Sequence, residues 1–189
     1  MVKILAISGS LRVASVNSAV LRSAAVLAPK GVEISVYQGL GDLPLFNPDL
    51  EGFEPFSVLD FRNQLKASDG VLISSPEYAH GITGVLKNAL DWIVGSGELV
   101  DKPVALLSVS LRAKHAPAAL EEVIKTMDSR LLKNGSITIP ISDNRMDQAG
   151  ILAHKELSVL LYNTIITFAC GIHPQTCSSL SYLDQEQFL

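Results

Sequence analysis

The chain has 189 residues, of which 48% are hydrophobic and 18% are charged, and its formal net charge is −4. This apolar content can build a substantial core, which argues against global disorder, and the length fits a single domain over 1–189. A negative chain without a basic block also argues against a nucleic-acid partner.

Short apolar runs alternate with amphipathic segments along the whole chain. In order, the first half predicts a strand at 2–7, a helix at 17–28, a strand at 32–36, a long loop at 39–55, a helix at 56–66, a strand at 69–75 and a helix at 83–94. The second half predicts a strand at 103–109, a helix at 116–132, a strand at 136–139, one last helix within 150–169 and a tail from about 171 to 189.

The predicted strands are continuous apolar runs, which is typical of a parallel sheet covered by helices on both faces. We therefore expect a doubly wound, five-stranded α/β fold. In such a sheet a ligand binds beyond the carboxyl ends of the strands, which directs attention to the loops at 8–16, 37–48, 74–84 and 108–117.

Several features predict a cytoplasmic protein without a membrane partner. The apolar stretch at 157–169 is short and interrupted by polar residues, so we read it as core, with an interface as the second choice. No apolar leader with a cleavage site opens the chain. Cys170 and Cys177 are the only cysteines, and we expect them to be reduced thiols. The scattered histidines and the absence of a C-x-x-C pair predict no metal site.

The loop after the first strand has the composition of a phosphate site. Its hydroxyls (Ser8, Ser10 and Ser15), the Asn17 amide and the Arg12 guanidinium precede a helix whose first N–H groups are free. With Gly9 as its single glycine, the loop does not match a dinucleotide fingerprint or a P-loop, so it favours one terminal phosphate. The alternative is an ordinary helix start, with Ser15 as the cap and Arg12 in solvent.

The loop after the third strand suits a flat heteroaromatic ring. Pro76 fixes the direction of the chain, Gly81 and Gly84 permit tight turns, and Tyr78 can pack against a ring.

These two loops carry a family resemblance. The sequences G-S-L-R-x-x-S-x-N at 9–17 and P-E-Y followed by L-K-N-A-L-D-W within 76–92 resemble the NADPH-dependent FMN reductases, and D-L-P-L-F-N at 42–47 is similar to a further loop of that family. The resemblance runs from residue 1 to at least 135. It implies a flavodoxin-like fold, bound FMN, NADPH or NADH as co-substrate, and quinones, azo dyes, chromate or free flavin as acceptors.

The resemblance also implies roles for individual residues. It places Ser10, Arg12, Ser15 and Asn17 at the FMN phosphate, with Ser8 and Val16 beside them, and Pro76, Glu77 and Tyr78 along the isoalloxazine ring. His80 would face the flavin or a neighbouring subunit. Leu86, Ala89, Leu90 and Trp92 would contribute to the interface of a homodimer or homotetramer.

One loop departs from the family. Many relatives have a glycine-rich turn after the fourth strand, whereas this chain has S-V-S-L-R-A-K-H at 108–115. Either Ser108 and Ser110 hydrogen-bond the carbonyl edge of the flavin, or that contact is altered. Arg112, Lys114 and His115 could bind an NADPH phosphate or form a solvated basic face.

The function expected from the sequence is an FMN-dependent NAD(P)H oxidoreductase, with no side chain assigned as catalytic because the cofactor carries the chemistry. A non-enzymatic electron carrier of the flavodoxin kind is the alternative. A flavin-free regulatory domain on the same fold is a third possibility.

Overall fold

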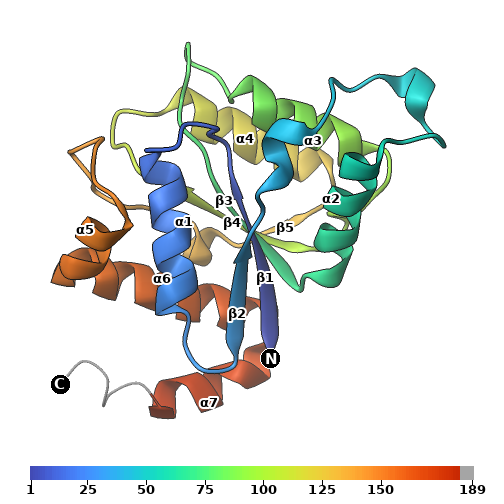
Figure 1. Cartoon of the computed structure of the whole chain (residues 1–189). Coiled ribbons are helices and arrows are strands. Elements are labelled where there is room, and N and C mark those ends of the chain that lie inside the picture. Colours follow the sequence, from blue (N-terminus) through green and yellow to red (C-terminus); the bar gives the residue numbers. More distant parts are fainter. Residues whose placement is uncertain (184–189) are drawn as a thin grey trace.

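A twisted parallel sheet forms the centre of the computed structural model, which describes residues 1–183 (Figure 1). Its strands lie in the order β2-β1-β3-β4-β5, and a short strand, β6, also pairs with β4. Every pairing between these strands is parallel. This order is that of the flavodoxin-like folds, so the predicted fold class is confirmed.

The elements are β1 (Val2–Ser8), α1 (Val16–Leu27), β2 (Val32–Val36), η1 (Gly39–Asp42), η2 (Pro48–Leu50), α2 (Phe56–Ala67), β3 (Gly70–Ser74), α3 (Gly84–Val94), β4 (Pro103–Ser108), α4 (His115–Thr126), β5 (Arg130–Leu131), η3 (Lys133–Gly135), β6 (Ile137–Thr138), α5 (Gln148–Ala153), α6 (Lys155–Ile172) and α7 (Pro174–Leu183). Up to the end of β4, the predicted helices and strands agree with these bounds to within one residue at each end. The long loop after β2 contains the two short 3-10 turns η1 and η2.

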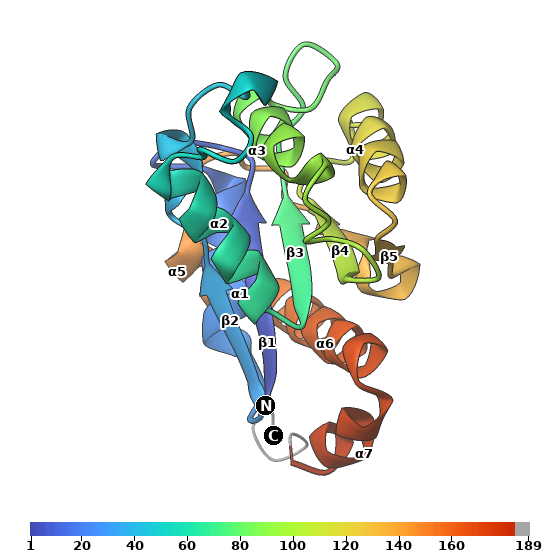
Figure 2. The ribbon, with the colours of Figure 1, turned by 90° about the vertical axis from the view of Figure 1, so that its right-hand side faces the viewer.

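Helices cover both faces of the sheet (Figure 2). Alternate side chains of β1 point to opposite faces, so Ile4 and Ala6 pack with α1 and α6, whereas Leu5 and Ile7 pack with α2, α3 and α4. The apolar stripe of α6 is buried against the first face, which confirms it as core. Among residues 1–183, no helix has the length and apolarity needed to cross a bilayer.

The helix predicted over 116–132 is wrong over its last six residues, because α4 ends at Thr126. Asp128 turns the chain with a left-handed φ of 53°. The chain then enters the sheet as β5, where the Arg130 N–H donates to the Lys102 carbonyl at 3.0 Å. Leu131 and Leu132 fit the pattern of a helix as well as that of a strand. This segment forms a strand because it satisfies the backbone hydrogen-bonding groups along the edge of β4.

Two short strands, and not one, occupy the fifth position of the sheet. The strand predicted at 136–139 contains β6, but β5 pairs with the beginning of β4 and β6 with its end. Between them, the Ser136 hydroxyl accepts a hydrogen bond from the Leu106 N–H at 3.0 Å and donates to the Leu132 carbonyl at 2.9 Å. This side chain therefore replaces the backbone partner that an uninterrupted strand would supply.

The single helix predicted within 150–169 is divided into α5 and α6. Asp147 caps α5 by accepting from the Gly150 N–H at 2.8 Å. His154 is extended, and its Nδ1 accepts from the Leu157 N–H at 3.5 Å. His154 thus ends α5 and caps the start of α6. The spacing of apolar residues does not reveal this break between the two helices.

The part of α3 expected at a subunit interface is core instead. Its four side chains, each at most 1% exposed, are Leu86, Ala89, Leu90 and Trp92. They pack on the sheet within the chain, so they cannot contact a partner, and the expectation was wrong for these residues. The outer face of α3 carries Lys87, which forms an ion pair with Asp91, and the half-exposed Val94.

The expectation of two reduced thiols is also wrong, because Cys170 and Cys177 form a disulfide. The tail predicted from about 171 contains the helix α7, which follows α6 after a tight turn. That turn brings the two cysteines to a Cα–Cα distance of 5.0 Å, close enough for a disulfide. Leu180 of α7 is buried in the core on the face of the sheet that α1 and α6 cover.

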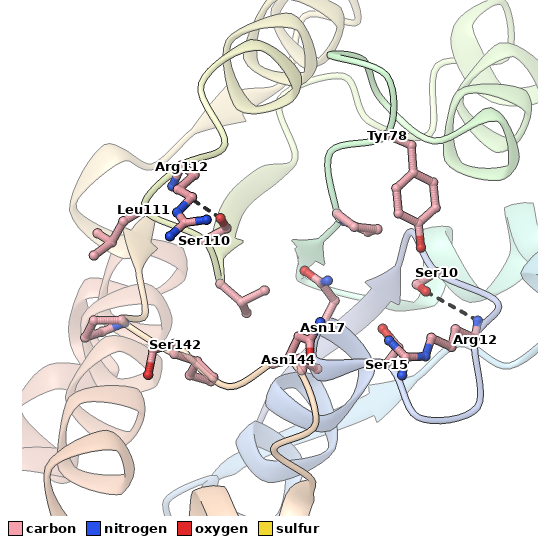
Figure 3. A pocket seen from close by; sticks show the side chains of 15 residues that line it. Ser10, Arg12, Ser15, Asn17, Tyr78, Ser110, Leu111, Arg112, Ser142 and Asn144 are labelled. Carbon is pink, nitrogen blue, oxygen red and sulfur yellow. Dashed lines mark hydrogen bonds between the residues drawn. The ribbon is translucent and has the colours of Figure 1, made fainter.

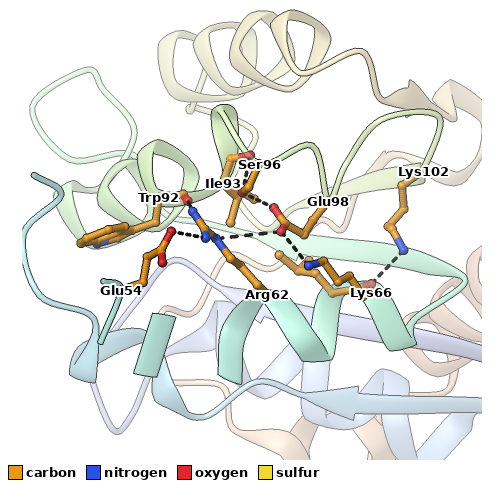
Figure 4. Close-up of polar contacts among 9 residues, drawn as sticks. Glu54, Arg62, Lys66, Trp92, Ile93, Ser96, Glu98 and Lys102 are labelled. Atoms are coloured by element: carbon orange, nitrogen blue, oxygen red, sulfur yellow. Dashed lines mark hydrogen bonds and ion pairs between the residues drawn. The ribbon is translucent and has the colours of Figure 1, made fainter. Parts of the chain in front are cut away.

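A charged network fixes α2 against the end of α3 (Figure 4). Arg62 donates to Glu54 at 2.7 Å and to the Trp92 carbonyl at 2.9 Å. The carboxylate of Glu98 is completely buried and lies 3.5 Å from the Lys66 ammonium. Glu98 is a buried acid and Arg62 is a largely buried base. Removing either side chain would leave the charge of the other uncompensated in the interior.

The disulfide yields a stability prediction. Reduction of Cys170–Cys177 should lower the free energy of unfolding by about 2 kcal/mol, because a short cross-link still restricts the unfolded chain. Denaturant unfolding with and without a reducing agent measures this difference. The Cys177→Ser variant should show the lower stability under both conditions. Two thiols that react in the native, unreduced protein would contradict the prediction.

Candidate functional site

A cavity of about 630 Å³ lies where the carboxyl ends of the strands meet (Figure 3). Its volume is within the range of small-molecule sites. The lining residues come from the loops after β1, β3, β4 and β6 and from the start of α1: Ser10, Arg12, Ser15, Val16, Asn17, Pro76, Tyr78, Val109, Ser110, Leu111, Arg112, Pro140, Ile141, Ser142 and Asn144.

The end of β3 holds these loops in register. Ser8 lies opposite Ser74, and Ser74 lies opposite Leu107. The fully buried Ser74 hydroxyl is 2.9 Å both from Asn17 Oδ1 and from the Leu107 carbonyl, and it can share its proton between these acceptors. The Gly9 N–H donates to the Ser74 carbonyl at 2.8 Å. One residue thus connects the first loop, the start of α1 and the end of β4.

The first loop presents donors to the cavity. Ser15 caps α1 by accepting from the Ser18 N–H at 3.4 Å, which leaves the hydroxyl proton of Ser15 available. Ser10 accepts from the Arg12 N–H at 3.3 Å and also keeps its proton. In residues 1–183 the Arg12 guanidinium forms no ion pair with a carboxylate. Ser15 is therefore the helix cap, as one of the two alternatives predicted. This role leaves the Arg12 guanidinium and the hydroxyl protons of Ser10 and Ser15 available to an anion.

The second loop is a tight hairpin that holds Tyr78 at the mouth of the cavity. Tyr78 and Gly81 exchange backbone hydrogen bonds of 3.2 and 2.9 Å. The two residues between them, Ala79 and His80, have positive φ values of 49° and 59°. Left-handed backbone at two non-glycine residues is costly, and such strain is often found at binding sites. Tyr78 lines the cavity although its side chain is largely exposed.

Glu77 supports the second loop from outside the cavity. Its Oε2 accepts hydrogen bonds from the N–H groups of Lys114, His115 and Ala116, at 3.0, 2.8 and 2.9 Å, and its Oε1 lies 3.1 Å from His80 Nδ1. The bond from Ala116 is the main cause that holds the pKa of the Glu77 carboxyl below its usual range. The carboxylate therefore occupies the first N–H groups of α4 and connects this helix to the hairpin.

Eight of the eleven predicted cofactor-binding residues line the cavity. The three outside the lining are Ser8, Glu77 and Ser108. The Ser8 hydroxyl is 2.7 Å from that of Ser18, and the Ser108 hydroxyl donates to the Ser110 carbonyl at 3.3 Å. Ser8 and Ser108 thus stabilise the two loops, whereas other residues of the same loops line the cavity.

One wall of the cavity was not anticipated. Pro140, Ile141, Ser142 and Asn144 follow β6, whose carboxyl end lies at the same edge of the sheet. The sequence could have indicated this loop, because it also follows a predicted strand. The loop at 37–48, in contrast, contributes no lining residue.

The charge of the lining is one-sided. It contains two arginines, and no aspartate, glutamate, histidine, lysine or cysteine. The cavity therefore suits an anionic ligand and supplies no side chain with a pKa suited to proton transfer near neutrality. Within residues 1–183, no three His, Cys, Asp or Glu side chains are grouped closely enough to hold a metal ion.

Comparisons with known proteins show extensive sequence similarity to one family. The family model for NADPH-dependent FMN reductase matches residues 2–141. An NAD(P)H-dependent FMN reductase of Pseudomonas aeruginosa is 37% identical over 167 residues, which cover 85% of this chain and 89% of that protein. A quinone reductase of Escherichia coli K12 is 29% identical over 153 residues, covering 77% and 81% of the two chains.

A solved structure extends the similarity to the fold. The flavoenzyme FerB of Paracoccus denitrificans, an NAD(P)H:acceptor oxidoreductase, superposes with a TM-score of 0.74 at 25% identity. The match covers 92% of this chain and 98% of that one.

The contacts of Glu77 predict a pH-dependent stability. A carboxyl whose pKa falls on folding contributes stability above its ordinary pKa of 4.5 and loses it as the pH falls through the lower folded value. Glu77→Ala should therefore lower the melting temperature by a few degrees at neutral pH, and the difference should shrink in acid. The matched control is Glu122→Ala, at an exposed position of α4. An equal loss at all pH values would show that charge is not the cause.

Proposed function

The chain belongs to the NADPH-dependent FMN reductase family and is an FMN-dependent NAD(P)H oxidoreductase, and from this premise we propose that a quinone is its electron acceptor. The relative from Escherichia coli is named a quinone reductase, which supports this choice over azo dyes, chromate and free flavin. The observation that carries the proposal is a cavity that combines cationic loops with apolar walls and whose lining contains no aspartate, glutamate, histidine, lysine or cysteine.

The first loop fits the phosphate end of FMN. We propose that the phosphate binds to Arg12, the Ser10 and Ser15 hydroxyls and the first N–H groups of α1, at Val16 and Asn17. These donors have the chemistry of a terminal phosphate site: a forked cation, hydroxyl protons without an acceptor in the described chain, and the positive end of a helix dipole. The single Gly9 gives no close backbone approach to the pyrophosphate of FAD.

The remaining walls fit a flat ring. The lining offers apolar surface at Pro76, Tyr78, Val109 and Ile141. Bound here, FMN would supply the redox chemistry between the nicotinamide and the acceptor. The work of these residues is to position the ring and to exclude water, while Arg12 and the start of α1 hold the negative charge of the cofactor.

The lining also bears on the alternative of an electron carrier. A carrier exchanges electrons at an exposed edge, whereas a reductase must admit two organic substrates. The volume of about 630 Å³ and the single aromatic side chain among the lining residues favour an open site over a ring enclosed between aromatics. We therefore prefer the reductase.

The test is the absorption spectrum of the purified protein. We expect flavin bands that bleach on anaerobic addition of NADPH or NADH and return when a benzoquinone is added. The extracted cofactor should co-migrate with FMN. A flavin that neither nucleotide bleaches would support the carrier, and colourless protein that takes up no FMN would support a regulatory domain.

We further propose a homodimer or homotetramer in the cytoplasm. Exposed apolar side chains at Leu45, Phe53 and Phe56 offer a surface for self-association. Dependence on NAD(P)H supports an intracellular location, although Cys170–Cys177 would have to resist reduction by the glutathione pool there. Sedimentation of the holoprotein measures the subunit number.

Arg12→Ala should weaken FMN binding roughly 30- to 150-fold while the fold is preserved, because a charge-assisted forked contact is lost. Quenching of flavin fluorescence on titration of the apoprotein measures the dissociation constant. Arg130→Ala, which removes the same charge from an exposed site on β5, is the control. An unchanged constant in the Arg12 variant would leave Arg12 as a solvated side chain.

Steady-state reduction of a quinone should follow ping-pong kinetics. The large cavity is where the ring of the cofactor would lie, and both substrates must reach that ring. A neighbouring cavity lined in part by Ser75, Ser108 and Ala116 measures about 20 Å³, which is too small for either substrate. We therefore expect the two substrates to use the large cavity in turn. Double-reciprocal plots should be parallel, and each substrate should compete with the other at high concentration. Intersecting lines would indicate a ternary complex and a separate nicotinamide site.

A further inference from the structure

Two loops at the cavity share one sequence, S-x-S-L-R: S-G-S-L-R at 8–12 and S-V-S-L-R at 108–112. They also share one geometry. The Arg112 N–H donates to the Ser110 hydroxyl at 3.2 Å, as the Arg12 N–H does to the Ser10 hydroxyl at 3.3 Å. In each loop the first serine hydroxyl donates to the carbonyl of the second, at 3.5 and 3.3 Å. The same turn is thus built twice, after β1 and after β4.

The two turns face one cavity from opposite sides (Figure 3). Ser10 and Arg12 line it on the side of α1, and Ser110 and Arg112 line it on the side of α4. Like Arg12, the Arg112 guanidinium has no carboxylate partner within residues 1–183. FMN carries a single phosphate, so one of the two cationic turns remains for another anion.

The second turn differs from the first in how it can hold that anion. The first N–H groups of α4 are already occupied by Glu77, so the helix start is closed to a ligand, whereas Val16 and Asn17 at the start of α1 line the cavity. Val109 stands where the first turn has Gly9, so the backbone cannot approach a ligand as closely. The donors left are the Arg112 guanidinium and the Ser110 hydroxyl, whose proton has no acceptor in the described chain.

A site made of side chains alone suits a terminal phosphate better than a pyrophosphate, which requires close backbone approach. We propose that Ser110 and Arg112 bind the 2′-phosphate of NADPH and thereby give the enzyme a preference for NADPH over NADH. The proposal rests on the reductase function and assigns Ser110 to the reductant instead of the carbonyl edge of the flavin. A guanidinium forks onto a phosphate monoester, which NADH lacks.

The test measures binding without turnover. Holoprotein is titrated by calorimetry with 2′,5′-ADP, which carries the 2′-phosphate, and with 5′-AMP, which does not. We expect wild type and Arg130→Ala to bind 2′,5′-ADP more tightly than 5′-AMP. Arg112→Ala should lose roughly tenfold to a hundredfold in affinity for 2′,5′-ADP, and the ratio of the KM for NADPH to that for NADH should rise by a similar factor.

Two outcomes would overturn the proposal. Equal affinity of the wild type for 2′,5′-ADP and 5′-AMP would show that the 2′-phosphate is not recognised. A loss of FMN affinity in Arg112→Ala as large as in Arg12→Ala would assign the second turn to the flavin phosphate.

The test also separates this proposal from the proposed function. A holoprotein that oxidises NADPH but binds 2′,5′-ADP independently of Arg112 refutes the phosphate site alone. One that binds 2′,5′-ADP through Arg112, yet is bleached by neither nucleotide, supports the site and refutes the reductase.

Discussion

The hydroxyl of Ser74, buried at the end of the central strand, is the contact on which the rest of the site depends. It lies 2.9 Å from Asn17 Oδ1 at the start of α1 and 2.9 Å from the Leu107 carbonyl near the end of β4. A buried hydroxyl must be satisfied, so the three chain segments can meet in only a few arrangements. The loops after β1 and β4 consequently face one another across β3, and the space between them becomes the cavity.

Electrostatics then determine what this space can do. The start of α1 directs N–H groups toward the cavity, and two arginines add charge without a carboxylate to neutralise it. A site of this kind binds anions but has no group that exchanges protons near neutrality. Cofactor chemistry is the natural use of such a site, since the protein needs only to bind, orient and shield.

Glu77 shows how one acid is kept out of that site. Although it follows Pro76 and precedes Tyr78, its carboxylate turns to the start of α4 and accepts three backbone hydrogen bonds there. The same contact braces a hairpin with two left-handed residues, and it closes the α4 start to ligands. The helix starts at α1 and α4 are therefore not equivalent, although the turns before them have nearly the same sequence.

The sequence by itself determined the elements as far as the end of β4, the sheet class and the segments after β1, β3 and β4 that supply eleven of the fifteen lining residues, because apolar runs and loop composition are local properties. It did not determine where α4 ends, the division into α5 and α6, or the burial of Leu86 and its neighbours on α3, since each depends on what packs alongside. The Cys170–Cys177 pairing, the outward turn of Glu77 and the wall at 140–144 were likewise decided by tertiary structure. Distances between segments remote in the chain follow from the packing of the whole sheet, and a local pattern carries no information about them.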